Sequence, residues 1–150
     1  MAGGSSLEAA ALYQLTGGNP FYVTEVLQAG MSEVPAAARD AVLARATRLG
    51  GEAREVLDVA ALVGARSDLR LVESVTACPP AAVDEVLASG LLAGDGGWLR
   101  FRHEIARLAV EQAIPARRRA AIHGQILTAL RSSGSQDEAQ MAFQIGRAHV

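Results

Sequence analysis

Hydrophobic residues recur at helical spacing along most of the chain, and glycine, proline and capping residues separate the runs. The clearest run places five apolar residues on one helical face: Ala53, Val56, Leu57, Ala60 and Val63. Half of the 150 residues are apolar, which is enough for a folded core. The pattern therefore predicts a mainly α protein.

Turn-forming residues delimit the first two helices. Ser6 is expected to cap a helix that ends at Thr16-Gly17-Gly18. Asn19 then fits the N-cap of a second helix, and Pro20 fits its first position, where the missing N–H costs nothing. This second helix is predicted to run to about Gln28.

Similar signals delimit the helices that follow. Pro35 is expected to begin a helix that Gly50-Gly51 ends. After the clearest run, either Ser67 or Asp68 caps a short helix, and Pro79-Pro80 opens the next.

One segment carries the only strand signal. Leu91 to Ala93 and Trp98 to Arg102 flank the turn sequence Asp95-Gly96-Gly97, and Leu99 and Phe101 alternate with polar or amphipathic residues. These features predict one β-hairpin. Helices followed by a hairpin are typical of a winged helix, and two further helices are predicted beyond it.

The basic residues narrow the possible functions, because all fourteen are arginine and the chain has no lysine. A phosphate-binding P-loop needs a lysine that reaches the β and γ phosphates. No nucleophile triad, metal-ligand spacing or paired carboxylate pattern stands out either. The chain is therefore expected not to be an enzyme, and no metal site is expected.

Cysteine content and hydropathy indicate the compartment. Cys78 is the only cysteine, so no intramolecular disulfide can form. The N-terminus has no signal-peptide pattern, and no apolar run approaches the ~20 residues that cross a bilayer. We expect a cytoplasmic protein without membrane contact. The net charge of −2 gives no general attraction to nucleic acid.

Two short motifs carry the candidate chemistry: Gly17-Gly18-Asn19-Pro20-Phe21 and Phe101-Arg102-His103-Glu104. Each opens a predicted helix, whose free N–H groups and dipole favour an anion. Both motifs also have a structural interpretation. Asn-Pro is an ordinary helix start, and His103 could cap its helix or fill the corner between hairpin and helix.

With these motifs, the chain resembles the signal-transduction ATPases with numerous domains (STAND), specifically large bacterial transcriptional activators with a C-terminal LuxR-type DNA-binding domain. The resemblance covers roughly Leu7 to Phe143. In that family a Gly-x-Pro segment places its proline against adenine, which matches Gly18-Asn19-Pro20. A Met-His-Asp-like motif brings its histidine to the β-phosphate of ADP. Its counterpart is Arg102-His103-Glu104, where only the histidine is retained.

The resemblance implies a domain organisation and a ligand. Residues 1–31 would be the end of the ATPase core with lid helices, 35–114 a winged helix, and 115–144 the start of a helical-repeat sensor. Residues 145–150 look like a translated sequencing adapter rather than native sequence. ATP or ADP would bind only together with an upstream core, with Gly18, Asn19, Pro20 and His103 as contacts.

The implied partners are the upstream nucleotide-binding domain and the downstream helical-repeat and DNA-binding domains of the same parent protein. A stand-alone winged-helix DNA-binding protein is the alternative, with Arg100 and Arg102 on its wing. Against it, the segment from Pro79 to Ser89 has no arginine, asparagine or glutamine and carries Asp84 and Glu85. Direct nucleic-acid contact is therefore not expected.

Overall fold

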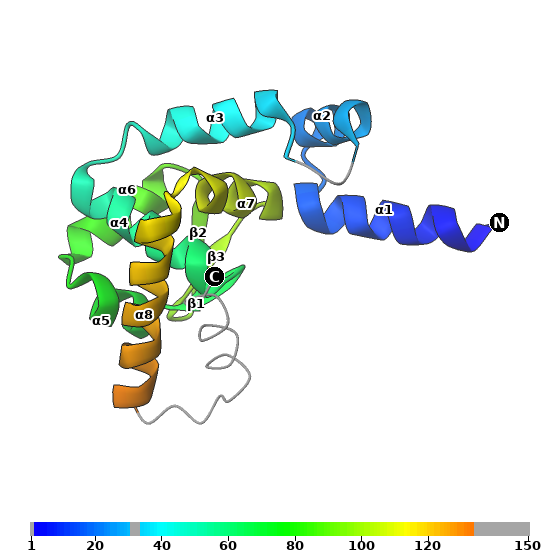
Figure 1. The fold of residues 1–150 in the computed structure, drawn as a ribbon. Coiled ribbons are helices and arrows are strands. Elements are labelled where there is room, and N and C mark those ends of the chain that lie inside the picture. Colours follow the sequence, from blue (N-terminus) through cyan, green and yellow to red (C-terminus); the bar gives the residue numbers. More distant parts are fainter. Residues whose placement is uncertain (1, 31–33, 134–150) are drawn as a thin grey trace.

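The computed structural model describes residues 2–30 and 34–133 (Figure 1). Within these ranges the chain forms eight helices and one small antiparallel sheet of three strands. The prediction of a mainly α fold with a β-hairpin is therefore confirmed. The end of the predicted segment 115–144, from residue 134 on, and the segment 145–150 lie outside the described residues.

Three helices form the N-terminal part: α1 (Ala2–Thr16), α2 (Pro20–Ala29) and α3 (Ala36–Ala46). Figure 1 shows that α1 extends away from the rest of the molecule, whereas α3 runs along the surface of the remaining helices. The end of α1 contacts α2 and α7, and α3 packs along α7. The expected N-cap at Ser6 was wrong, because the helix already begins at Ala2 despite the low helix propensity of the glycines and serines there.

Helix α4 (Gly51–Val63) lies at the centre of the core. It contacts α5, α6, α7, α8 and strand β1, so every residue from Val56 to Val63 is buried, and not only the predicted stripe. The predicted boundary between α3 and α4 was also wrong. Helix α3 already ends at Ala46, and Gly51 is the first residue of α4 rather than a stop signal.

The sheet has the strand order β1-β3-β2, with β1 (Arg66–Asp68), β2 (Leu92–Asp95) and β3 (Trp98–Phe101). Strands β2 and β3 form the predicted hairpin, whose two-residue turn places Gly96 at φ 55°, a conformation that favours glycine. Strand β1 was not predicted. Its three polar residues give no apolar alternation, and pairing with β3 places only Ser67 inside the core.

Two short helices lie between β1 and the hairpin: α5 (Leu69–Thr76) and α6 (Pro80–Ala88). Of the two capping candidates, Asp68 caps α5, since its Oδ1 accepts the Arg70 N–H at 2.8 Å. Ser67 instead donates a hydrogen bond to the Ala60 carbonyl. The resulting order of helix, strand, two helices and hairpin agrees with a winged helix.

The sheet has one buried and one exposed face. Leu92, Leu99 and Phe101 point into the core, whereas Trp98 and Arg100 are exposed. On the exposed face Arg66 lies directly opposite Arg100, and the Arg66 guanidinium lies 4.2 Å from the ring centroid of Trp98. The strand pairing thus collects positive charge beside an aromatic ring.

Helices α7 (Glu104–Ala113) and α8 (Ala116–Ser132) complete the described chain. Helix α7 follows the hairpin directly and packs between α3 and α4. Helix α8 begins after Pro115 and packs against α4 and α5 with a stripe of Ile122, Ile126 and Leu130. The start of α7 therefore lies close to the N-terminal helices.

Candidate functional site

The turn between α1 and α2 contains two glycines in left-handed conformation. Gly17 has φ +63° and Gly18 has φ +79°. The Gly17 N–H donates to the Tyr13 carbonyl at 2.7 Å, and the Gly18 N–H donates to the Thr16 hydroxyl at 3.2 Å. Thr16 itself is fully buried. These bonds end α1 and turn the chain sharply into α2.

Asn19 and Pro20 begin α2 as predicted. The Asn19 Oδ1 accepts the Phe21 N–H at 3.0 Å, and Pro20 occupies the first helical position. Gly18 and Pro20 are exposed, and Asn19 is half-buried. Their role in shaping the helix start is confirmed, whereas a contact with nucleotide remains a prediction.

Replacing Asn19 with alanine is expected to lower the free energy of unfolding by about 1 kcal/mol, because α2 loses its side-chain cap. Asn19→Asp retains the acceptor and serves as the matched control. Urea denaturation of both variants measures the difference. Equal stabilities of the alanine and aspartate variants would show that the cap contributes nothing.

His103 lies between β3 and α7, at the N-cap position of α7. Its side chain makes no capping hydrogen bond, although its carbonyl accepts the Ala106 N–H at 3.0 Å. Of the two structural interpretations, filling the corner between hairpin and helix fits this geometry. The imidazole is only half-buried.

The imidazole packs directly against the turn between α1 and α2. A Cβ placed on Gly17 would lie 2.6 Å from His103 Nδ1 and 3.1 Å from the Arg102 carbonyl oxygen. In α2, the Tyr22 ring meets the imidazole edge-on, with 5.1 Å between the centroids. The structure therefore brings the two sequence motifs together, through Gly17 and Tyr22.

Burial and positive charge act on the imidazole in the same direction. Burial has the largest effect and lowers the pKa of His103 below 6.5, and the nearby Arg102 and Arg45 lower this pKa further. The Thr16 backbone carbonyl opposes part of this shift of the pKa. Nδ1 is buried and faces the turn at Gly17. The surroundings of His103 thus favour the neutral imidazole.

The lowered pKa of His103 predicts a pH dependence of stability. The unfolded chain takes up a proton near pH 6.5, but the folded chain does so only at lower pH. The contribution of His103 is therefore fully present above pH 6.5 and is lost as the pH falls from there through the folded-state pKa. Urea unfolding across this window should give a flatter pH dependence for His103→Asn than for the unaltered chain, and identical slopes would contradict the assignment.

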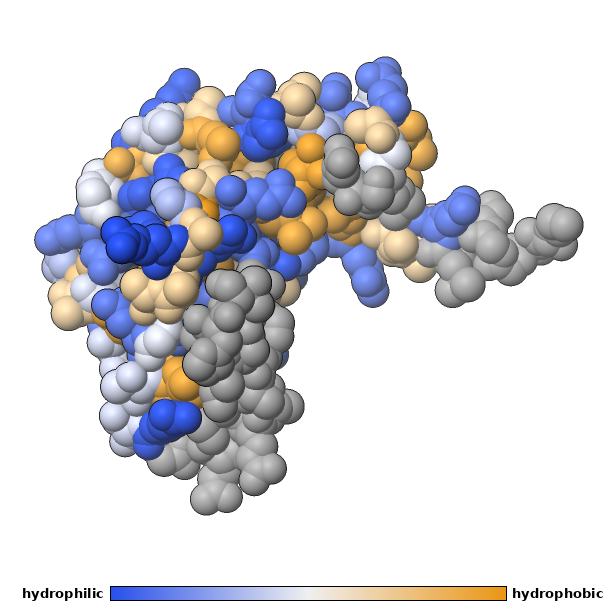
Figure 2. Space-filling model, in the orientation of Figure 1, coloured by the Kyte–Doolittle hydropathy of each residue, from blue (hydrophilic) through white to orange (hydrophobic). Residues whose placement is uncertain are grey.

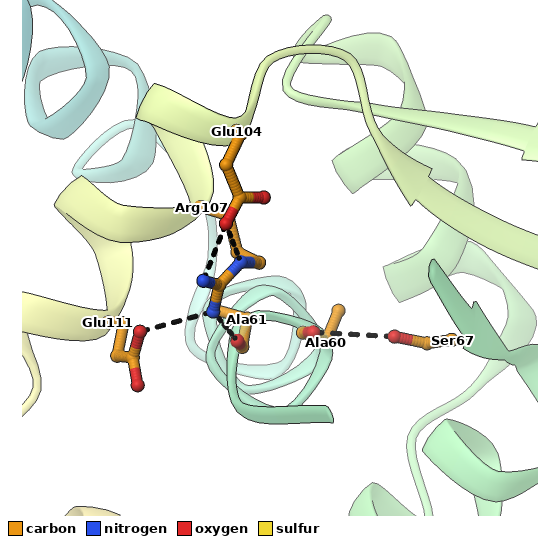
Figure 3. A network of polar contacts seen from close by, with 6 residues as sticks. All are labelled: Ala60, Ala61, Ser67, Glu104, Arg107 and Glu111. Atoms are coloured by element: carbon orange, nitrogen blue, oxygen red, sulfur yellow. Dashed lines mark hydrogen bonds and ion pairs between the residues drawn. The ribbon is translucent and has the colours of Figure 1, made fainter. Parts of the chain in front are cut away.

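A polar network holds the start of α7 against α4 (Figure 3). Arg107 Nη1 donates to the Ala61 carbonyl at 3.0 Å and to Glu111 Oε2 at 3.1 Å. The same guanidinium binds Glu104 Oε1, at 2.6 Å from Nη2 and 2.8 Å from Nε. The network fixes the first turn of α7 and with it the backbone of His103.

Sequence reasoning missed Tyr22 and Arg45 beside His103, and also the ion pairs within α7. Tyr22 is buried in the core, and its ring also contacts the imidazole. Arg45 lies far away along the chain, and no local pattern connects it to His103. The spacing of Glu104, Arg107 and Glu111 in one helix is a signal for ion pairs that could have been found.

Comparison with known proteins adds no family assignment. No protein-family model, curated protein or solved structure matches the chain. Over the described ranges, no helix combines the length and apolar character needed to cross a bilayer. The nature of the site therefore depends on its own geometry and on the two motifs.

Proposed function

We propose that this chain is the nucleotide-sensing segment of an ATP/ADP-switched transcriptional regulator of the STAND and LuxR type. The observation that carries the proposal is the contact between Gly17 and His103, where a Cβ would lie only 2.6 Å from Nδ1. It places the two motifs that open α2 and α7 at one junction. Both helix starts can then face one bound nucleotide of a neighbouring module.

The proposed mechanism is a switch without chemistry in this chain. In the ADP state, Pro20 contacts the adenine and His103 contacts the β-phosphate, which holds the winged helix on the upstream core. Exchange for ATP weakens these contacts and releases the winged helix, and inducer binding to the downstream repeats biases the exchange. Because the chain lacks lysine, the P-loop and any hydrolysis belong to the upstream core.

The surface of the N-terminal helices supports an upstream partner. Exposed large apolar side chains occur on α1 and α2: Tyr13, Phe21 and Leu27. Figure 2 shows apolar surface gathering where α2, α3 and α7 come together. Apolar surface of this kind is typical of contact with another domain. We infer that the upstream nucleotide-binding domain covers it in a cytoplasmic parent protein.

Retention of ADP tests the proposal. The chain is expressed joined to the proposed upstream nucleotide-binding module, and the ADP that copurifies is quantified. Pro20→Ala and His103→Ala are each expected to weaken ADP binding about tenfold, since each removes a contact to the nucleotide. Gln28→Ala on α2 and Arg100→Ala on β3 are the exposed controls. Unchanged ADP retention in both test variants would contradict the proposal.

The exposed sheet face supports the second candidate, a stand-alone winged-helix DNA-binding protein. Arg66 and Arg100 face each other there beside Trp98. Helix α6 opposes this function, because Asp84 and Glu85 are exposed on it. Titration with duplex DNA at low salt separates the candidates. Tight, salt-sensitive binding that Arg66→Gln weakens would favour the second candidate.

A further inference from the structure

A cationic corner lies beside His103, formed by Arg45 and Arg102 from separate elements. Arg45 is in the last turn of α3, and its Nη1 would lie 3.8 Å from a Cβ on Gly90. The N–H of Arg102 donates to the carbonyl of Leu91, the residue after Gly90, at 3.1 Å. The Arg45 side chain therefore lies against the turn before β2, and the backbone of Arg102 is hydrogen-bonded to the residue that follows this turn. Both arginines raise the positive potential at His103.

One carboxylate, that of Glu85, lines the same groove as Arg45, but no ion pair joins the two within the described part of the chain. Neither Arg45 nor Arg102 forms an ion pair there, and both are exposed. Arg45, Arg48 and Glu85 line a groove of about 500 Å³ beside the corner. One Glu85 oxygen already accepts the Gly50 N–H at 3.0 Å. An anion that enters from outside would therefore relieve the repulsion between the cations.

We propose that Arg45 and Arg102 bind the same phosphate group as His103, and that the imidazole takes up one proton from solvent when this phosphate binds. The inference rests on the proposed function, which places a phosphate at His103. It adds a charged residue from α3 to the site and a coupling between phosphate and proton binding. The ligand class is a di- or triphosphate whose terminal groups reach the corner.

The groups that face the imidazole explain the coupling. Tyr22 of α2 and the two arginines add no negative charge, and the Glu104 carboxylate of α7 is held by Arg107. Burial and both cations lower the pKa of His103. A bound phosphate offsets the cations and raises this pKa again. Phosphate and proton therefore favour each other's binding.

The test uses the 150-residue chain and inorganic pyrophosphate as the probe. NMR of the ¹⁵N-labelled imidazole follows the pKa of His103 at constant ionic strength, held with sodium chloride, with pyrophosphate up to about 20 mM. Pyrophosphate is expected to raise this pKa by about one unit. Arg45→Gln should raise the pKa of His103 in the absence of pyrophosphate and weaken pyrophosphate binding about fivefold, with Arg102→Gln acting in the same direction.

Arg66→Gln is the matched control, because it removes one exposed arginine outside the corner and should change binding less than twofold. Arg45→Gln and Arg66→Gln could change pyrophosphate binding by the same factor while pyrophosphate still raises the pKa of His103. This result overturns the inference and retains the proposed function. No response of His103 to pyrophosphate overturns the inference as well. The ADP retention of the joined protein decides separately on the proposed function.

Discussion

Replacing Arg107 with methionine is expected to lower the free energy of unfolding by about 3 kcal/mol, the largest effect of a single substitution that we predict. The side chain of Arg107 is 16% exposed, and that of Glu111 only 9%. Methionine leaves the carboxylates of Glu104 and Glu111 without their shared cation and the Ala61 carbonyl without this donor. Removing a cation from carboxylates in a largely buried site is costly because water replaces it only in part.

Two further variants identify the cause of this loss. Arg100→Met removes an exposed arginine that forms no ion pair with the described residues, and it should change stability by less than about 0.5 kcal/mol. Adding Glu104→Gln to the Arg107→Met variant removes one uncompensated charge and should recover about 1 kcal/mol. Chemical denaturation measures all three. If Arg107→Met and Arg100→Met lowered the free energy of unfolding by the same amount, the network in Figure 3 would contribute no stability.

Replacing Gly17 with alanine is expected to lower the free energy of unfolding by about 2 kcal/mol. The residue has φ +63°, where an L side chain costs roughly 1 kcal/mol. The added Cβ would also lie 2.6 Å from His103 Nδ1, closer than van der Waals contact permits. Either α1 or the imidazole must therefore move, which adds to the cost.

Gly96→Ala separates the two contributions. Gly96 has a similar φ of +55°, but no heavy atom lies within 4 Å of its added Cβ. It should therefore lose only the conformational part, roughly 1 kcal/mol, and leave the imidazole signals of His103 in place. NMR and urea denaturation report both quantities. If Gly17→Ala costs no more than Gly96→Ala and leaves the His103 signals unchanged, the contact has no energetic role.

The sequence predicted those parts of the fold that depend on local chemistry. Asn19 and Pro20 begin α2, and the Gly96-Gly97 turn joins β2 and β3, because capping and positive φ values are properties of a few neighbouring residues. Strand β1 escaped prediction, since its three residues are held by pairing with β3 alone. The full burial of α4 likewise depends on neighbours from four other helices.

The candidate site was predictable only in part, for the same reason. The local roles of Gly18 and Asn19 follow from the sequence, and His103 was chosen from its motif. Its contact with Gly17 requires α1 to pack on α7, and its electrostatic environment requires α3 to bring Arg45 into the corner. Such placements depend on helix packing, which no motif in a single sequence encodes.

The central claim is that the turn before α2 and the imidazole of His103 contact one nucleotide. The most direct measurement is a crystal structure of the chain joined to the proposed upstream nucleotide-binding module, with ADP bound. We predict a distance of about 3 Å between an imidazole nitrogen of His103 and an oxygen of the β-phosphate, with Pro20 against the adenine. Phosphates bound at a distance from His103, with its imidazole still packed only against Gly17 and Tyr22, would contradict the claim.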